Sequence, residues 1–191
     1  QTYVGSYNLP GYNNIRKWLE VDGVLYTAVG KPGGGAVLRY RGDLTDGDPS
    51  NDMNFEVVGE LTEDGAELAL HDGRLFVNTW PSNFGGNVAG LWMSPVIPEG
   101  GLDASHAGDW TKVFSYDEYE PDPSVASTYG GGALYSYQGD LYWGTMHVPG
   151  LATMIHFLTY GMDYIADAED LEQIELALTG NIRAISIFRG R

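Results

Sequence analysis

The most regular feature of the sequence is the alternation of short apolar runs with glycine-containing turns. In residues 69–81, ALHDGRLFVNTWP, two runs rich in apolar and aromatic residues flank Asp72 and Gly73. Asp-Gly is a strong signal for a two-residue turn, because both residues tolerate a backbone with positive φ. The flanking valine, leucine and aromatic residues favour strands. This segment therefore predicts a β-hairpin.

The same hairpin pattern occurs three times along the chain. Residues 15–30 and 131–147 align with residues 69–81 when Asp22, Asp72 and Gln138 share one position. A glycine, a variable residue, a leucine and an aromatic residue then follow in each copy: Gly23, Leu25 and Tyr26; Gly73, Leu75 and Phe76; Gly139, Leu141 and Tyr142. We therefore interpret the chain as a repeat of short antiparallel strands.

Further strands are expected after each hairpin. Residues 36–42 (AVLRYRG) and 184–190 (AISIFRG) match at their alanine, β-branched, aromatic, arginine and glycine positions, and residues 89–95 (AGLWMSP) are a looser copy. Residues 54–61 and 110–116 have the composition of a fourth strand in the first two copies. The expected repeats cover residues 14–61, 65–116 and 131–191.

Four-stranded units of about 40 to 50 residues are the blades of β-propellers. On the repeated segments DGVLYTAVG and AVLRYRG, the sequence resembles Kelch-like and related propeller repeats, although it lacks the di-glycine and tryptophan signature of true Kelch repeats. The resemblance implies an all-β propeller with at least three four-stranded blades in one domain or propeller fragment, residues 1–191. Because closed propellers have about four to eight blades, we expect more chain or further copies to complete the ring.

The third copy contains an insertion, residues 148–183, between its second and third strands. Residues 151–160 and 167–180 are predicted to be helical, and the second helix would begin at Asp167 and end before Gly180. Two interpretations are open. The insertion shapes a site for a partner or ligand, as long loops often do, or it covers apolar surface.

The composition is strongly acidic, with 26 acidic and 10 basic residues and a net charge of −16. This charge argues against nucleic acid and anionic membrane surfaces as partners. No apolar run reaches the roughly 18 residues that a membrane span needs. The absence of cysteine and the abundance of aspartate, glycine and tyrosine favour an extracellular or cell-surface protein, although salt-adapted cytoplasmic proteins are similarly acidic.

Candidate ligand-binding residues come from the third copy: Tyr135, Tyr137, Trp143, His147 and His156. Aromatic rings beside polar side chains suit the stacking and hydroxyl recognition of carbohydrates. The two histidines flank the start of the insertion and are a candidate metal pair, although their spacing matches no zinc motif. The alternative is that these aromatic residues pack between blades and that the histidines are structural.

An acidic loop, residues 42–54, offers a candidate calcium site. Asp43, Asp46, Asp48 and Asp52 lie close together there, and Ca²⁺ takes several oxygen ligands from flexible loops. The EF-hand pattern of glycine and glutamate positions is absent, so a solvated loop between strands is the alternative. No other cofactor is expected.

No sequence motif for a nucleophile, a phosphate loop or a zinc protease is present. Glu20 and Glu67 lie on two expected inner strands and are a candidate pair of channel carboxylates. We expect a non-catalytic extracellular module for recognition or structural assembly, with a protein partner or further blades. The alternative is a carbohydrate-active enzyme, a glycoside hydrolase or polysaccharide lyase, that uses channel carboxylates.

Overall fold

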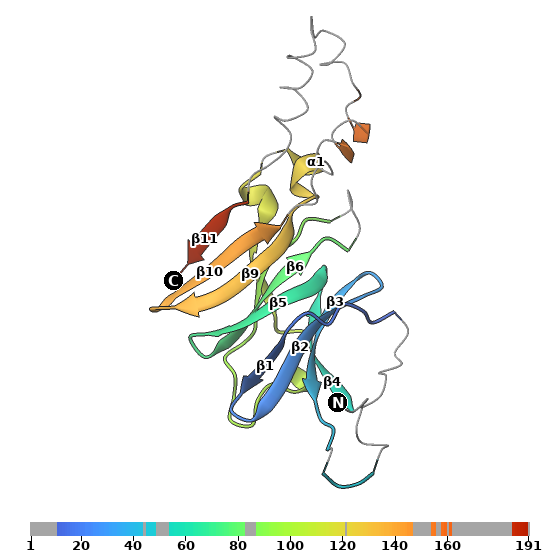
Figure 1. The fold of residues 1–191 in the computed structure, drawn as a ribbon, viewed down its shortest axis with the longest axis vertical. Coiled ribbons are helices and arrows are strands. Elements are labelled where there is room, and N and C mark those ends of the chain that lie inside the picture. The colour runs from blue at the N-terminus through green and yellow to red at the C-terminus, as the bar shows by residue number, and fades with distance from the viewer. Residues whose placement is uncertain are drawn as a thin grey trace, which may run out of the picture.

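Three antiparallel β-sheets follow one another along the chain (Figure 1). This computed structural model describes residues 11–43, 45–48, 54–82, 87–120, 122–146, 154–155, 158–159, 161 and 185–190. The first sheet has the order β1 (Trp18–Val21), β2 (Val24–Lys31), β3 (Gly34–Tyr40), β4 (Phe55–Leu61). The second has the order β5 (Asp64–His71), β6 (Arg74–Trp80), β7 (Gly90–Met93), β8 (Thr111–Ser115). The third has the order β11 (Ile187–Gly190), β10 (Asp140–Met146), β9 (Gly130–Tyr137).

Each sheet begins with the hairpin that the sequence predicts. The turn residues Asp22, Asp72 and Gln138 have φ values of 49°, 45° and 52°, and the glycine that follows each also has positive φ. Two successive residues with positive φ form the turn whose twist matches that of antiparallel strands. The repeat of antiparallel hairpins and the all-β class are therefore confirmed.

The sheets pack face to face, with the second between the other two. β2 packs against β5, and both β5 and β6 pack against β9 (Figure 1). We call the face that a sheet turns toward the following sheet its forward face, and the opposite face its back face. The core between the first and second sheets contains Val21, Tyr26, Ala28, Val37, Val58, Leu61, Leu68, Leu75, Val77, Leu102 and Trp110. The core between the second and third contains Ala69, Phe76, Leu91, Leu134, Leu141 and Trp143.

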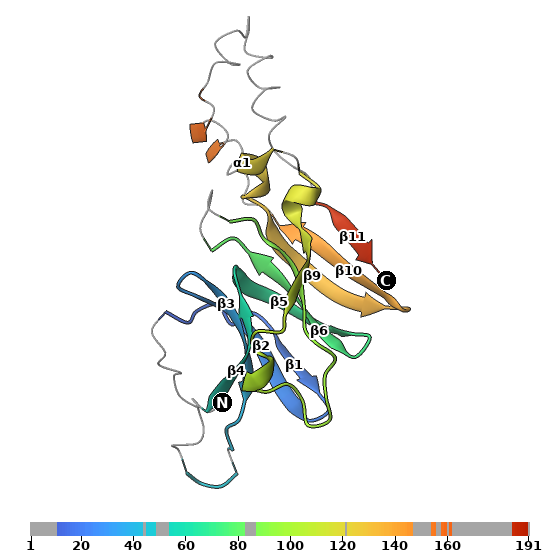
Figure 2. The same ribbon diagram turned by 180° about the vertical axis from the view of Figure 1, so that it is seen from behind.

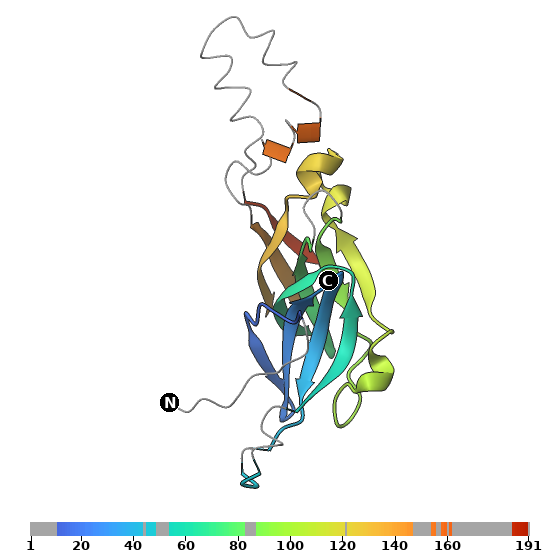
Figure 3. The ribbon, with the colours of Figure 1, turned by 90° about the vertical axis from the view of Figure 1, so that its right-hand side faces the viewer.

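Short helical turns lie in the connections of the first two sheets and before the third, namely η1 (Ala104–His106), η2 (Tyr116–Glu118) and α1 (Pro123–Ala126). The connection from β7 to β8, residues 94–110, contains η1 and leaves the second sheet to run along the first (Figure 2). η1 lies beside β4 of the first sheet (Figure 3). We call residues 94–110 the strap.

The third strands do not align as the sequence match indicates. That match makes Arg189 the equivalent of Arg41. In the structure, Tyr142 pairs with Arg189, whereas Tyr26, the equivalent of Tyr142 in the first sheet, pairs with Arg39. Arg39 and Arg189 are therefore the equivalent residues. The offset is two positions, which keeps every side chain on the same face of the strand and so leaves the apolar pattern intact.

Within the described residues the three sheets form an array, and no closed ring is present. The third sheet has three strands in this part of the chain. Most of the predicted insertion, residues 148–183, lies outside the described residues, so its helices stay a prediction. No helix in the described ranges is long and apolar enough to cross a membrane.

Candidate functional site

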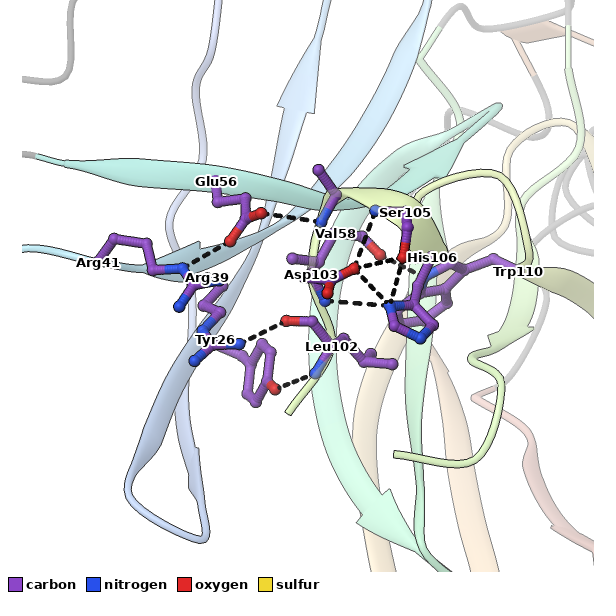
Figure 4. Close-up of polar contacts among 11 residues, drawn as sticks. Tyr26, Arg39, Arg41, Glu56, Val58, Leu102, Asp103, Ser105, His106 and Trp110 are labelled. Atoms are coloured by element: carbon purple, nitrogen blue, oxygen red, sulfur yellow. Dashed lines mark hydrogen bonds and ion pairs between the residues drawn. The ribbon is translucent and has the colours of Figure 1, made fainter. Parts of the chain in front are cut away.

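The backbone of Leu102 in the strap is bound by two side chains of the first sheet. Its N–H donates to the hydroxyl of Tyr26 at 2.9 Å, and Arg39 donates from Nη1 to its carbonyl oxygen at 2.9 Å (Figure 4). The Leu102 side chain is fully buried, in the same core cluster as Tyr26. The two side chains thus act as a clamp on both polar groups of one peptide residue.

Further hydrogen bonds fix the strap on β4, and two of them involve side chains. The N–H of Ala104 donates to Oε1 of Glu56 at 2.9 Å, and Nε1 of Trp110 donates to the carbonyl of Val58 at 2.8 Å (Figure 4). Partial burial raises the pKa of Glu56, but hydrogen bonds from Ala104 and Arg41 outweigh it, so the pKa lies below its usual value. The ionised form of Glu56 is therefore favoured, and its carboxylate accepts the hydrogen bond from the N–H of Ala104 in the strap.

The same row of three positions crosses every sheet. In the first sheet the row is Leu19, Tyr26 and Arg39; in the second Ala69, Phe76 and Met93; in the third Tyr135, Tyr142 and Arg189. Tyr26 and Phe76 belong to the cores that separate their sheet from the following one, so the row lies on the forward face. The third sheet carries the tyrosine and arginine of the first sheet at equivalent positions.

The forward face of the third sheet is exposed. Tyr135 and Ile187 are 66% and 76% exposed, whereas Val37, the equivalent of Ile187 in the first sheet, is fully buried. A shallow depression of about 160 Å³ lies on this face and is lined by Ala133, Tyr135, Tyr142, Trp143, Gly144 and Ile187. This forward face is the candidate functional site, because apolar side chains that the repeat buries elsewhere are accessible on it.

The predicted ligand-binding residues are divided between two faces and the undescribed part of the chain. Tyr135 and Tyr137 both lie on the exposed forward face of the third sheet, which we call the open face, and Tyr137 is 55% exposed. Trp143 projects from the opposite face into the core against the second sheet, where its ring stacks on Phe188. His147 and His156 lie outside the described residues. Carbohydrate binding by the tyrosines stays a prediction.

The other two histidines have structural contacts. Nδ1 of His71 lies 2.8 Å from the hydroxyl oxygen of Ser136, which links the second and third sheets. His106 lies 2.9 Å from the carboxylate of Asp103 and completes the cap of η1.

The acidic loop is described in part, and its carboxylates contact their own loop. Asp43 accepts hydrogen bonds from the hydroxyl and N–H of Thr45, which lower its pKa, and Asp46 accepts from the N–H of Asp48. Asp52 lies outside the described residues. Across the ranges that the structure describes, no three histidine, aspartate or glutamate side chains gather as a metal site. Calcium binding therefore stays a prediction.

The proposed pair of channel carboxylates does not converge. Leu19 and Val21 face the second sheet, so the alternation of β1 places Glu20 on the back face of the first sheet. Glu67 pairs with Asn78 and shares the forward face of Ala69, toward the third sheet. Glu20 and Glu67 therefore lie on different faces of different sheets and do not line one channel. The alternative of a carbohydrate-active enzyme is left without the carboxylate pair that was its candidate site.

Tyr142, Ile187 and Arg189 are the site residues that sequence reasoning did not select. The repeat marks the positions of Tyr142 and Arg189, but a repeated position ordinarily indicates packing between sheets. The sequence does not show which sheet is last in the array. Comparisons with protein families, with curated protein sequences and with solved structures give no match. The resemblance to Kelch-like repeats is therefore supported only at the level of three antiparallel sheets of three or four strands.

Proposed function

We propose that the chain is a non-catalytic assembly module that associates head to tail with a second copy of itself. The forward face of the third sheet in one copy would receive the back face of the first sheet in the other. The observation that carries this proposal is the exposure of Tyr135 and Ile187, at positions whose counterparts in the first two sheets lie in the inter-sheet cores or pack against them.

The back face of the first sheet has the complementary character. Trp18 lies on this face, stacks on Phe55 with ring centroids 6.2 Å apart, and is 44% exposed. Its equivalents in the second and third sheets are Leu68 and Leu134, which are 0% and 2% exposed because the preceding sheet covers them. Trp18 is thus accessible at one end of the array, whereas Val29, Ala36 and Leu38 on the same back face are buried against Tyr12, Phe55 and Val57.

Head-to-tail association also satisfies the geometry of repeat assemblies. Interfaces between different faces of identical copies form rings when the rotation closes. Two copies of three sheets give six sheets, which is within the range of about four to eight blades in closed propellers. The acidity of the chain and its lack of cysteine support an extracellular or cell-surface setting for such a module.

The proposal is tested by the mass of the protein in solution, measured by sedimentation velocity and native mass spectrometry. We expect a species of two chains, each of 20.8 kDa. The variant Ile187→Lys should weaken association by about tenfold or more, because it buries an unpaired charge in an apolar interface. Val96→Lys is the matched control, since Val96 is 58% exposed but lies in the strap.

A mixing experiment distinguishes head-to-tail association from a symmetric dimer. Trp18→Lys should also give monomers, with folding checked by circular dichroism. A mixture of Trp18→Lys with Ile187→Lys retains one intact pair of faces, so a mixed dimer should form. A wild-type chain that remains monomeric up to its solubility limit, or a mixture without mixed dimer, would overturn the proposal.

A further inference from the structure

We propose that residues 2–7 (TYVGSY) of one copy form the fourth strand of the third sheet in the neighbouring copy. We call these residues the N-terminal segment. The segment would run antiparallel to β11 and pair with its outer edge. This inference rests on the proposed function, that two copies associate head to tail. It goes further because it names the segment that pairs, the edge that receives it and the register between them.

The receiving edge is the side of β11 that faces away from β10. The carbonyl of Ser186 accepts the N–H of Thr145 at 2.9 Å, so the backbone of Ser186 bonds toward β10. Successive residues of an antiparallel strand direct their backbone groups to alternate sides, so Ile187 and Arg189 direct theirs to the outer side. In the part of the chain that the structure describes, no strand pairs with this side. An edge of this kind is a template for a further strand.

The N-terminal segment matches the fourth strands of the first two sheets. TYVGSY and residues 111–116 (TKVFSY), which contain β8, have the same threonine, valine, serine and tyrosine at their first, third, fifth and sixth positions. In the same alignment, residues 56–61 of β4 (EVVGEL) match its valine and glycine. Every position of the segment except Tyr3 is therefore identical to one of the two fourth strands.

The match extends to an irregularity that both fourth strands share. The register with the third strand shifts by one residue at the same place in β4 and β8, which leaves Val58 and Val113 as the unpaired extra residues. Both valines align with Val4. Carried over to β11, the register of β8 pairs Thr2 with Arg189, Tyr3 with Phe188, Gly5 with Ile187 and Ser6 with Ser186.

The order of strands along the chain assigns the segment to the sheet that precedes the first one. β4 ends at Leu61 and β5 begins at Asp64, so the fourth strand of one sheet leads into the first strand of the following sheet. The N-terminal segment stands in the same order before β1. In a head-to-tail pair, the sheet that precedes the first sheet of one copy is the third sheet of the other.

The third sheet of the same chain is too distant to receive the segment. Gly11 lies against Pro32 in the turn between β2 and β3, and the second sheet separates the first sheet from the third (Figure 1). Packed sheets lie about 10 Å apart, so about 20 Å separates the first sheet from the third. The four residues from Tyr7 to Gly11 span at most about 14 Å. That length crosses one spacing between sheets, to the neighbouring copy, and not two.

A pair of engineered cysteines tests the contact directly, because the natural chain contains none. Ser6→Cys and Ser186→Cys are made in separate full-length chains, one of them isotope-labelled, and the two are mixed and oxidised. In this register the two residues are a non-hydrogen-bonded pair, whose side chains are close enough for a disulfide. We expect a mixed disulfide-linked dimer by mass spectrometry. Val96→Cys in place of Ser186→Cys is the control and should give background only, since Val96 is exposed but lies in the strap.

Two proline variants test the register through self-association, measured by sedimentation velocity. Gly5→Pro removes the N–H that would donate to the carbonyl of Ile187, and should weaken association about tenfold or more. Ser6→Pro is the matched control, because this register directs the N–H of Ser6 away from β11, where an edge strand accepts proline. It should associate within about twofold of the wild type.

The outcomes separate this inference from the proposed assembly. A wild-type dimer without the mixed cross-link, or with equal effects of the two prolines, would keep the assembly and overturn the pairing of the segment with β11. The double variant Ser6→Cys with Ser186→Cys tests a single chain. A disulfide that forms only within that chain would overturn pairing between copies. A mixed cross-link in a chain that sediments as a monomer would support the pairing and overturn a stable two-chain assembly.

Discussion

Two buried tyrosine hydroxyls form hydrogen bonds at the contacts between neighbouring sheets. The Tyr26 hydroxyl accepts the N–H of Leu102, and the Tyr116 hydroxyl donates to Oδ1 of Asn78 at 2.9 Å. The Asn78 amide in turn donates to the carbonyl of Gly144 at 3.1 Å, which joins the second sheet to the third. Burial raises the pKa of both tyrosines, because a phenolate would lose its hydration.

These two tyrosines predict a loss of stability at alkaline pH. Their pKa is raised in the folded state, so the unfolded chain ionises first, near pH 10, the ordinary value for tyrosine. Their contribution is complete below about pH 10 and is lost as the pH rises toward the folded-state values. Urea unfolding between pH 8 and pH 11 should show the midpoint falling above about pH 10.

The control for this pH dependence is the double variant Tyr26→Phe with Tyr116→Phe. It should be less stable at neutral pH, because Asn78 and Leu102 each lose a hydrogen-bond partner, at a cost of about 1–3 kcal/mol per site. It should also show a smaller fall above pH 10. An equal fall in the variant would mean that other groups cause the alkaline loss.

At the residue scale the sequence predicts turns better than it predicts the site. Asp22, Asp72 and Gln138 are recognisable because turn chemistry is local. Tyr135 and Tyr137 are also recognisable as candidate surface aromatics. The sequence does not predict Arg189 as a site residue, because its role depends on pairing with Tyr142. An insertion separates the two residues, and the sequence pattern does not give the pairing across it.

At the scale of elements, the strap is the piece that joins one sheet to the next. Its partners Tyr26 and Arg39 precede Leu102 by 76 and 63 residues. No periodicity signals contacts over that distance, so the sequence predicts only a connection between two strands here. The strand repeat itself is predicted well, apart from the two-residue offset of the third strands. The Arg-Gly ending that residues 36–42 and 184–190 share in the sequence conceals this offset.

The strap gives a prediction with a matched control in the same connection. Gly101→Ala should destabilise the fold by more than about 1 kcal/mol, because alanine is strained at φ +86° and its Cβ would collide with the Tyr26 hydroxyl. Gly108→Ala has no neighbour within 4 Å of the added Cβ and no left-handed backbone, so it should be close to neutral. Thermal unfolding of the two variants compares them directly, and equal effects would contradict the clamp geometry at Leu102.

At the scale of the whole molecule, apolar surface and charge act against each other. The two open ends of the array expose Trp18, Tyr135 and Ile187, which favours association. Each copy also carries a net charge of −16, which opposes the approach of a second copy. The balance between these two effects depends on the ionic strength, because salt screens the repulsion and leaves the apolar contact.

We therefore predict that salt strengthens self-association. Raising NaCl from about 0.05 to 0.5 M shortens the screening length from well over 10 Å to about 4 Å, so repulsion between the two acidic chains falls. Sedimentation velocity at fixed protein concentration should show the two-chain fraction rising with salt. Ile187→Lys should remain monomeric at both ionic strengths, because screening cannot restore the apolar contact. A two-chain fraction that falls with salt would mean that ion pairs, and not the open apolar faces, hold the copies together.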